Sequence, residues 1–164
     1  MEGVAMTDRS GVDREHQLEE HRRPEGVDDA TVAAVGKLSE ALEKVEDARG
    51  HLYAFHRLCG SADLTLGDAV DQLRAAGHGE LADLLDRELV GRNIIEGRWS
   101  YQVVEEYDDT YWSVFRGLEA DVRAELMQGR RHIFEAEMKE DRRSHGVRHH
   151  ESVPDDSGPQ SPPG

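Results

Sequence analysis

Apolar residues recur at intervals of three and four through the first half of the chain, and this spacing restricts the fold more than any other feature. On a helix of 3.6 residues per turn, such positions form one continuous apolar stripe. Asp28 and Asp29 precede the stripe and are good helix caps, and Gly60 suits the position that ends a helix. The spacing therefore predicts a long helix over residues 30–59, with its stripe formed by Val35, Leu38, Leu42, Val45, Leu52 and Cys59.

The remaining apolar residues indicate further helices. Their spacing predicts a short helix over residues 65–76, a second piece over 80–91 and a final long helix over 108–139. Residues 92–107 fit strand alternation as well as helical spacing. Because a lone strand would have no partner in this chain, we expect a mixed loop and helical turn there.

Composition divides the chain into three parts. An acidic N-terminal tail, residues 1–28, and a C-terminal tail, residues 141–164, are polar and show no sustained period. Neither can bury enough apolar surface to offset the entropy of ordering, so we expect both to be disordered. Residues 29–140 are predicted to form one all-α domain, a three- or four-helix antiparallel bundle. Its two long helices would overhang the broken shorter segment and expose part of a stripe, which predicts a homodimer.

The charge balance excludes several classes of protein. Acidic residues outnumber basic ones by 35 to 20, and the formal net charge is −15. This charge repels phosphate backbones, so we expect no nucleic-acid binding, whereas it would attract a basic protein partner. No apolar stretch is long enough to suggest a membrane span, and the first residues do not resemble a secretion signal. The single cysteine, Cys59, fits a reducing compartment, so a cytoplasmic location is expected. Arginine supplies most of the basic residues, a bias typical of bacterial genomes rich in G and C.

Aromatic residues cluster in one short segment. Six of the nine lie between positions 99 and 115, interleaved with carboxylates and flanked by arginines. Large rings beside charges are typical of binding surfaces, although the same rings could pack one end of a bundle against the first helix. We predict a partner-binding surface formed by Arg98, Trp99, Tyr101, Tyr107, Tyr111 and Trp112.

Carboxylates and histidines at helical spacing are candidate metal ligands. Glu43, Asp47 and His51 recur every four residues along the first predicted helix, and Glu119 and His132 flank the stripe of the last one. Facing helices of this kind build carboxylate-bridged di-iron sites, but those sites need Glu-x-x-His motifs, which this chain lacks. A divalent transition metal or a small ligand held by these residues is therefore an alternative, and the main prediction requires no cofactor.

Signals for catalysis are weak. His56 and Cys59 have the spacing of two zinc ligands or of a base and its nucleophile, but the C-terminal end of a helix disfavours a thiolate. Arg49 lies on the stripe and needs a carboxylate partner, which Glu119 or Glu125 could supply. The sequence therefore predicts an acidic cytoplasmic protein-interaction or regulatory module without catalytic activity, and a metal- or ligand-binding bundle as the alternative.

Overall fold

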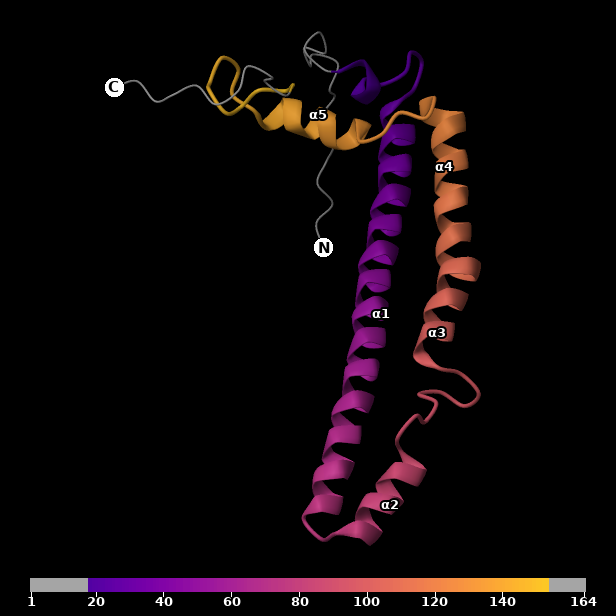
Figure 1. The fold of residues 1–164 in the computed structure, drawn as a ribbon. Helices are drawn as coiled ribbons and strands as arrows, with labels where there is room; N and C mark the ends of the chain where they lie inside the picture. Colours follow the sequence, from indigo (N-terminus) through magenta and orange to yellow (C-terminus); the bar gives the residue numbers. More distant parts are fainter. Residues whose placement is uncertain (1–17, 154–164) are drawn as a thin grey trace, which may run out of the picture. The chain divides into compact units, whose positions relative to one another are not determined.

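The structure is a computed structural model that describes residues 18–153, and this part of the chain is built from helices (Figure 1). Its only extended pairing among these residues is an isolated bridge between Ile95 and Arg98. The predicted all-α helical bundle is thereby confirmed, while residues 1–17 and 154–164 of the predicted tails lie outside the described residues. The elements in chain order are η2 (Glu19–His21), α1 (Asp29–Ala75), α2 (Gly79–Glu88), α3 (Ser100–Tyr107), η3 (Asp108–Trp112), α4 (Ser113–Met127) and α5 (Ile133–Arg142).

Helix α1 is 47 residues long, so the predicted end at Gly60 and the separate helix over 65–76 are wrong. A glycine inside a helix costs only about 1 kcal/mol, and the apolar stripe continues in phase beyond it through Leu66 and Val70. The Thr65 hydroxyl, a candidate cap for a new helix, instead donates to the Ser61 carbonyl oxygen at 2.9 Å within the continuous helix.

The predicted helix over 108–139 is wrong at both ends. Helical structure begins earlier, at Ser100, where the Trp99 backbone N–H donates to the Gln102 side chain at 2.9 Å. It stops at Met127, because the next two residues, Gln128 and Gly129, have left-handed φ values of 54° and 75°. Of the mixed loop and helical turn expected in residues 92–107, the loop is present before Ser100, whereas the rest of the segment is the full helix α3.

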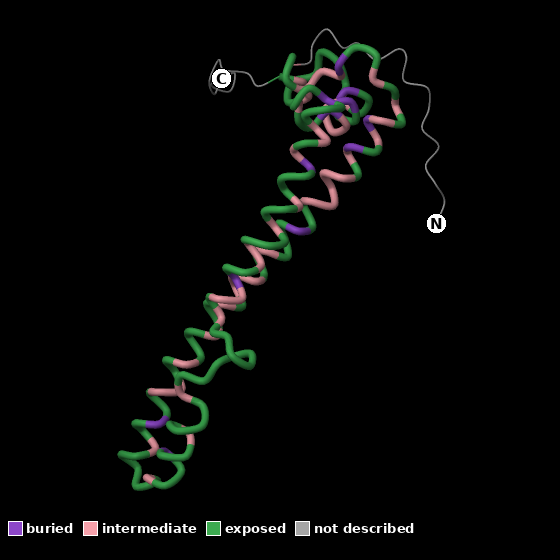
Figure 2. The backbone as a smooth tube through the Cα atoms, turned by 90° about the vertical axis from the view of Figure 1, so that its right-hand side faces the viewer, coloured by how far each residue is buried: buried purple, intermediate pink, exposed green. Residues whose placement is uncertain are grey.

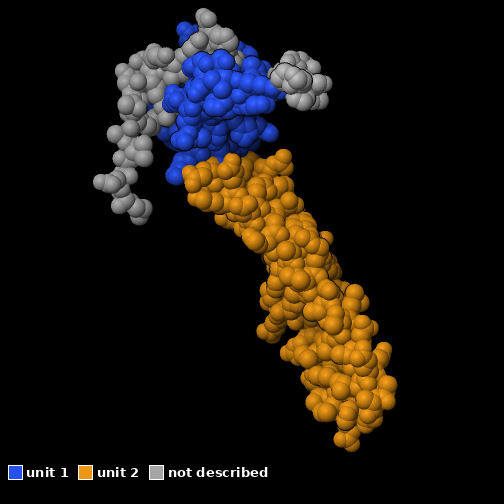
Figure 3. All heavy atoms as spheres, turned by 90° about the vertical axis from the view of Figure 1, so that its left-hand side faces the viewer, with its two compact units in different colours: residues 1–39, 119–164 blue, residues 40–118 orange. Residues whose placement is uncertain are grey.

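Contacts divide the chain into two compact units (Figure 3). Unit 1 comprises residues 1–39 and 119–164, and unit 2 comprises residues 40–118. None of the helices within residues 18–153 combines the length and the hydropathy needed to cross a bilayer.

Unit 1 contains the main apolar core. Val32, Val35, Met127 and Ile133 are buried together, and Phe134 packs beside them. Gly36 permits this approach, because a Cβ at that position would lie 3.1 Å from the Cβ of Phe134.

A buried ion pair ties residues from the predicted N-terminal tail to α5 in unit 1. The Arg23 guanidinium donates to both carboxylate oxygens of Glu137, at 2.7 and 2.6 Å, and also to Asp29. The side chains of Arg23 and Glu137 are only 7% and 3% exposed. The tail predicted over residues 1–28 thus contributes packed residues to unit 1 from its last third.

Unit 2 is an antiparallel helical hairpin. Its first arm is α1, and its second arm consists of α2, α3, η3 and the start of α4. The two arms run in opposite directions, as three hydrogen-bonded pairs between them show. These pairs are Arg74 with Asp83, His56 with Ser100, and Arg49 with Asp108. Few residues are buried between the arms (Figure 2). They are Val45, Val70, Ala82 and Val104.

The second arm lies alongside α1 over the whole of unit 2. The overhang of a long helix beyond a shorter segment, from which a homodimer was predicted, is therefore absent in this unit. Apolar side chains are nevertheless exposed in this unit, among them Leu58 at 69% and Leu118 at 61%. The reason is that a two-helix hairpin buries one stripe on each arm and leaves the other sides of both arms in water.

Replacing Glu137 with alanine is expected to destabilise unit 1 by about 3 kcal/mol, because Arg23 would keep a buried charge without its main partner. Urea unfolding followed by circular dichroism measures this change. Lys44→Ala, which breaks the exposed pair between Lys44 and Glu40, is the control and should leave the unfolding midpoint nearly unchanged. Equal effects of the two substitutions would contradict the role of the buried pair.

Candidate functional site

A hydrogen-bonded ion pair holds the two arms of unit 2 together. The Arg49 guanidinium of α1 donates to both carboxylate oxygens of Asp108, at 2.7 and 2.9 Å. The Tyr53 hydroxyl donates to the same carboxylate at 2.6 Å. Arg49 thus has the carboxylate partner that its place on the stripe requires, but this partner is Asp108 rather than Glu119 or Glu125. Such a two-point contact is directional as well as strong, so it fixes where η3 lies on α1.

The same contacts shift the pKa values of the groups involved. Hydrogen bonding from Arg49 lowers the pKa of Asp108, and the bond from Tyr53 adds to this effect. The pKa of Tyr53 is raised, because its hydroxyl donates to the Asp108 carboxylate and would lose that bond on ionisation. The carboxylate is therefore ionised at neutral pH, which is the state that both bonds need.

Trp112 of the second arm adds a ring to this group, and we call Arg49, Tyr53, Asp108 and Trp112 together the anchor. The Arg49 guanidinium lies 4.2 Å from the centroid of its ring, and that of Arg116 lies 5.2 Å from it. The indole N–H donates to Glu46 of α1 at 2.8 Å. Cation–π contacts and this bond turn Trp112 toward α1. Trp112 was predicted for the partner-binding surface, but the fold uses its ring internally.

The segment Asp108–Trp112 is a π-helix, whose wider turn presents its residues differently from an α-helix. Two side-chain hydroxyls on this part of the arm bond to their own backbone. Thr110 donates to the Glu106 carbonyl oxygen, and Ser113 donates to that of Asp109 at 2.7 Å. Both hydroxyls are thus satisfied without a partner from outside the helix.

The side of this arm that faces water is apolar. Tyr111, Val114 and Leu118 are 50%, 53% and 61% exposed. A surface helix ordinarily carries charged residues on the side away from its packing partner. Here the exposed residues that lie between these three side chains are small and uncharged, and charged residues lie only around them. We call this set the outer face, and it consists of Thr110, Tyr111, Ser113, Val114, Gly117 and Leu118.

Aromatic rings support one edge of the outer face. The Tyr111 ring lies 5.4 Å from that of Tyr107 and 6.1 Å from that of Phe115, measured between ring centroids. Tyr107 is half-buried, and its hydroxyl donates to the Val45 carbonyl oxygen of α1 at 3.4 Å. Burial raises the pKa of this hydroxyl. The outer face is therefore backed by packed rings.

The other predicted partner-binding residues form a separate group at the start of α3. The rings of Trp99 and Tyr101 meet edge to face with centroids 5.7 Å apart, and the residues are 57% and 43% exposed. Arg98 pairs with Glu106 on the next turns of the arm. The sequence analysis grouped these residues with Tyr111 because they are close in the chain. In the structure, Trp99 and Tyr101 form a ring pair of their own, whereas Tyr111 lies on the outer face.

The candidate metal ligands do not form a site. Glu43, Asp47 and His51 are exposed on α1. Burial raises the pKa of Glu119 in unit 1, but bonds from Arg123 and Ser39 outweigh this effect and leave the pKa lowered. His132 in unit 1 precedes α5 with a left-handed φ of 57°. Within residues 18–153, no three histidine, cysteine, aspartate or glutamate side chains are grouped to hold a metal ion.

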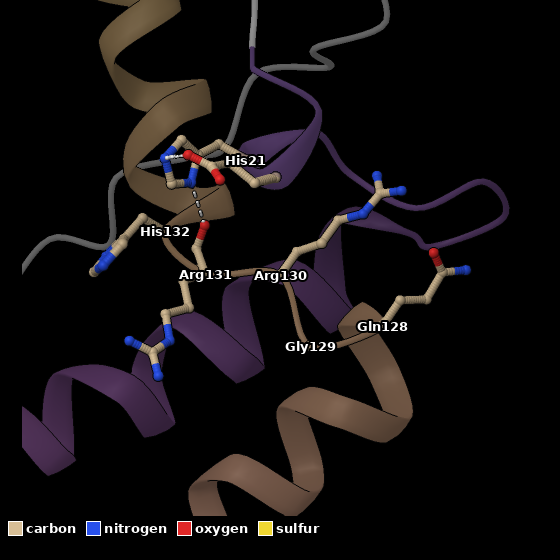
Figure 4. Close-up of a pocket in the computed structure, with 7 residues that line it drawn as sticks. His21, Gln128, Gly129, Arg130, Arg131 and His132 are labelled. Carbon is tan, nitrogen blue, oxygen red and sulfur yellow. Dashed lines mark hydrogen bonds and ion pairs between the residues drawn. The ribbon is translucent and has the colours of Figure 1, made fainter.

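A pocket in unit 1 was not predicted from the sequence. It has a volume of about 460 Å³ and is lined by the loop between α4 and α5 together with Glu20 and His21 (Figure 4). The His21 ring bonds to the Arg131 carbonyl oxygen at 2.8 Å, and Arg130 donates to Glu19. Figure 4 shows the Arg130 and Arg131 guanidinium groups pointing in different directions, so they do not converge on one ligand.

The pair predicted from spacing, His56 with Cys59, is not the pair that forms. The His56 ring bonds instead to the Ser100 hydroxyl of α3 at 2.8 Å. Within the described residues, no carboxylate bonds to the other ring nitrogen of His56, so the group that orients a catalytic histidine is missing.

Comparison with protein-family models, with curated proteins and with solved structures finds no match to this chain. Its function is therefore inferred from the side chains of the outer face and of the anchor beneath it.

Replacing Asp108 with asparagine is expected to destabilise unit 2 at neutral pH and to matter less in acid. The pKa of Asp108 is lower in the folded protein than its ordinary value. Its contribution to stability is therefore present above about pH 4 and is lost as the pH falls through the lowered folded value.

Urea unfolding of the wild type and of Asp108→Asn, measured from pH 7 down to about pH 2, tests this expectation. The two unfolding midpoints should differ at pH 7 and converge in acid. A difference that stays constant across this range would contradict the assigned ion pair.

Proposed function

We propose that this protein is a non-catalytic protein-interaction module that docks a helix of another polypeptide chain on its outer face. The observation that carries the proposal is the exposure of Tyr111, Val114 and Leu118 on successive turns of one arm, with the uncharged Thr110, Ser113 and Gly117 between them. Fully burying a side chain of this size is worth about 1.5–3 kcal/mol, so covering the half that is still exposed contributes roughly half of this. Ser113 and Gly117 lie between them and leave room for a second helix to approach closely.

The hydroxyl groups of the outer face are already hydrogen-bonded, which also favours a docking role. Thr110 and Ser113 already donate their hydroxyl hydrogens to carbonyl oxygens of their own helix. Removing water from these residues would therefore leave no unpaired donor, which is the usual penalty for covering polar side chains.

The net negative charge of unit 2 limits which proteins could dock on it. Residues 40–118 contain 16 acidic and 8 basic residues. A partner other than the chain itself would therefore be basic, and the negative field of unit 2 would steer it. The single cysteine is in keeping with a cytoplasmic setting for this interaction.

Site-specific photocrosslinking tests the docking role. A photoreactive phenylalanine analogue at position 111 should yield a discrete covalent product in the cells that make the protein, because the partner helix covers that ring. The same analogue at Leu64, which is 75% exposed on α1 outside the outer face, is the matched control and should yield none.

Adding Leu118→Glu to the Tyr111 variant should abolish the product by placing a charge in the contact. If the products from positions 111 and 64 are equally abundant, or if neither forms, the outer face is not a docking surface.

A further inference from the structure

Three apolar residues of the outer face, together with the half-buried Tyr107 that supports its edge, have a spacing that is the same in both directions along the helix. Tyr107, Tyr111, Val114 and Leu118 are separated by four, three and four residues. A helix that runs antiparallel to this one with the same sequence presents the same three intervals. It would place Tyr111 opposite the partner's Val114, and Tyr107 opposite the partner's Leu118.

We propose that a second copy of this chain occupies the outer face, in antiparallel orientation, with the two-fold axis between Trp112 and Ser113. This inference rests on the proposed docking function and names its partner. The contact is isologous, since each copy uses the same surface and every contact occurs twice.

Charges beside the outer face determine the orientation. Asp109 and Arg116 are exposed at the edge of the outer face and lie at equal distances along the chain from the proposed axis. Within residues 18–153, neither forms an ion pair, and Arg116 makes a cation–π contact with the Trp112 ring. Two-fold rotation brings this edge against itself, so Asp109 would face the partner's Arg116, and Arg116 would face the partner's Asp109. A parallel pair would instead place the two copies of this edge on opposite sides of the contact, so neither charge would meet its opposite on the partner.

Small residues occupy the positions nearest the axis. Ser113 adjoins the axis, and Gly117 follows one turn later, so no bulky side chain separates the two helices there. The Ser113 hydroxyl is bonded to its own helix at 2.7 Å and brings no unpaired donor into the contact. The net negative charge of each copy opposes association, so we expect a weak dimer whose association strengthens with added salt.

Charge reversal tests both the partner and the orientation, with sedimentation velocity of the full chain as the measurement. Asp109→Arg and Arg116→Asp should each raise the dissociation constant about tenfold or more, because each places like charges in contact twice. The double variant, with both substitutions, should restore dimerisation because the pairs re-form with their signs exchanged. Asp68→Arg makes the same charge change on an exposed part of α1 and should not weaken the dimer.

Two further variants separate loss of contact from loss of fold. Leu118→Glu should abolish the dimer with an unchanged circular dichroism spectrum, whereas Leu64→Glu should leave the dimer intact. A wild-type chain that stays monomeric at concentrations on the order of 100 µM overturns the inference. A double variant whose dissociation constant is as high as those of the single variants also overturns the inference.

These failures differ from failure of the docking role itself. A crosslinked product at position 111 that contains a different, basic protein would overturn the second copy as partner and leave the docking function standing. Absence of any product at position 111 would overturn both.

Discussion

The bond between Arg49 and Asp108 is the interaction on which the arrangement of unit 2 depends. A guanidinium on the stripe of α1 cannot lie half-buried without a carboxylate, and the second arm supplies one at the first residue of η3. Tyr53 and the Trp112 ring enclose the same charge. Because neighbouring residues of a helix point about 100° apart, a shift of one residue would turn Asp108 away from Arg49. The pair therefore sets which residues of the second arm meet α1.

The outer face is a consequence of this register. With Asp108 and Trp112 turned toward α1, Tyr111 and Val114 face the opposite way. A hairpin of two helices has no third layer to cover them, so they remain about half exposed. Their exposure contrasts with unit 1, where Met127 and Ile133 are buried in a shared core. The part of the chain with the weakest core of its own is thus the part that offers the most apolar surface to another chain.

Helix positions were easier to predict than helix ends. The stripe from Val35 to Leu52 indicated the first helix correctly, because side-chain spacing reports helical periodicity directly. Gly60 was read as a stop, but the contacts of both flanking segments with the second arm outweigh the small cost of one glycine. Gly129 lies inside the helix predicted over residues 108–139, yet its left-handed φ of 75° helps to end α4. Whether a glycine continues or ends a helix depends on tertiary contacts, which local sequence does not contain.

For the aromatic segment, too, the sequence predicted one part of the result and tertiary contacts decided the other. Its composition was enough to locate a candidate surface between residues 98 and 112, since large rings beside charges are unusual wherever they occur. It could not separate Trp112, which is held by Arg49 and Glu46, from Tyr111, which points to water one residue earlier. It also gave no reason to include Val114 and Leu118. Periodicity and charge follow from the order of residues alone, whereas the side of a helix that stays exposed depends on which distant residue, here Arg49, binds the opposite side.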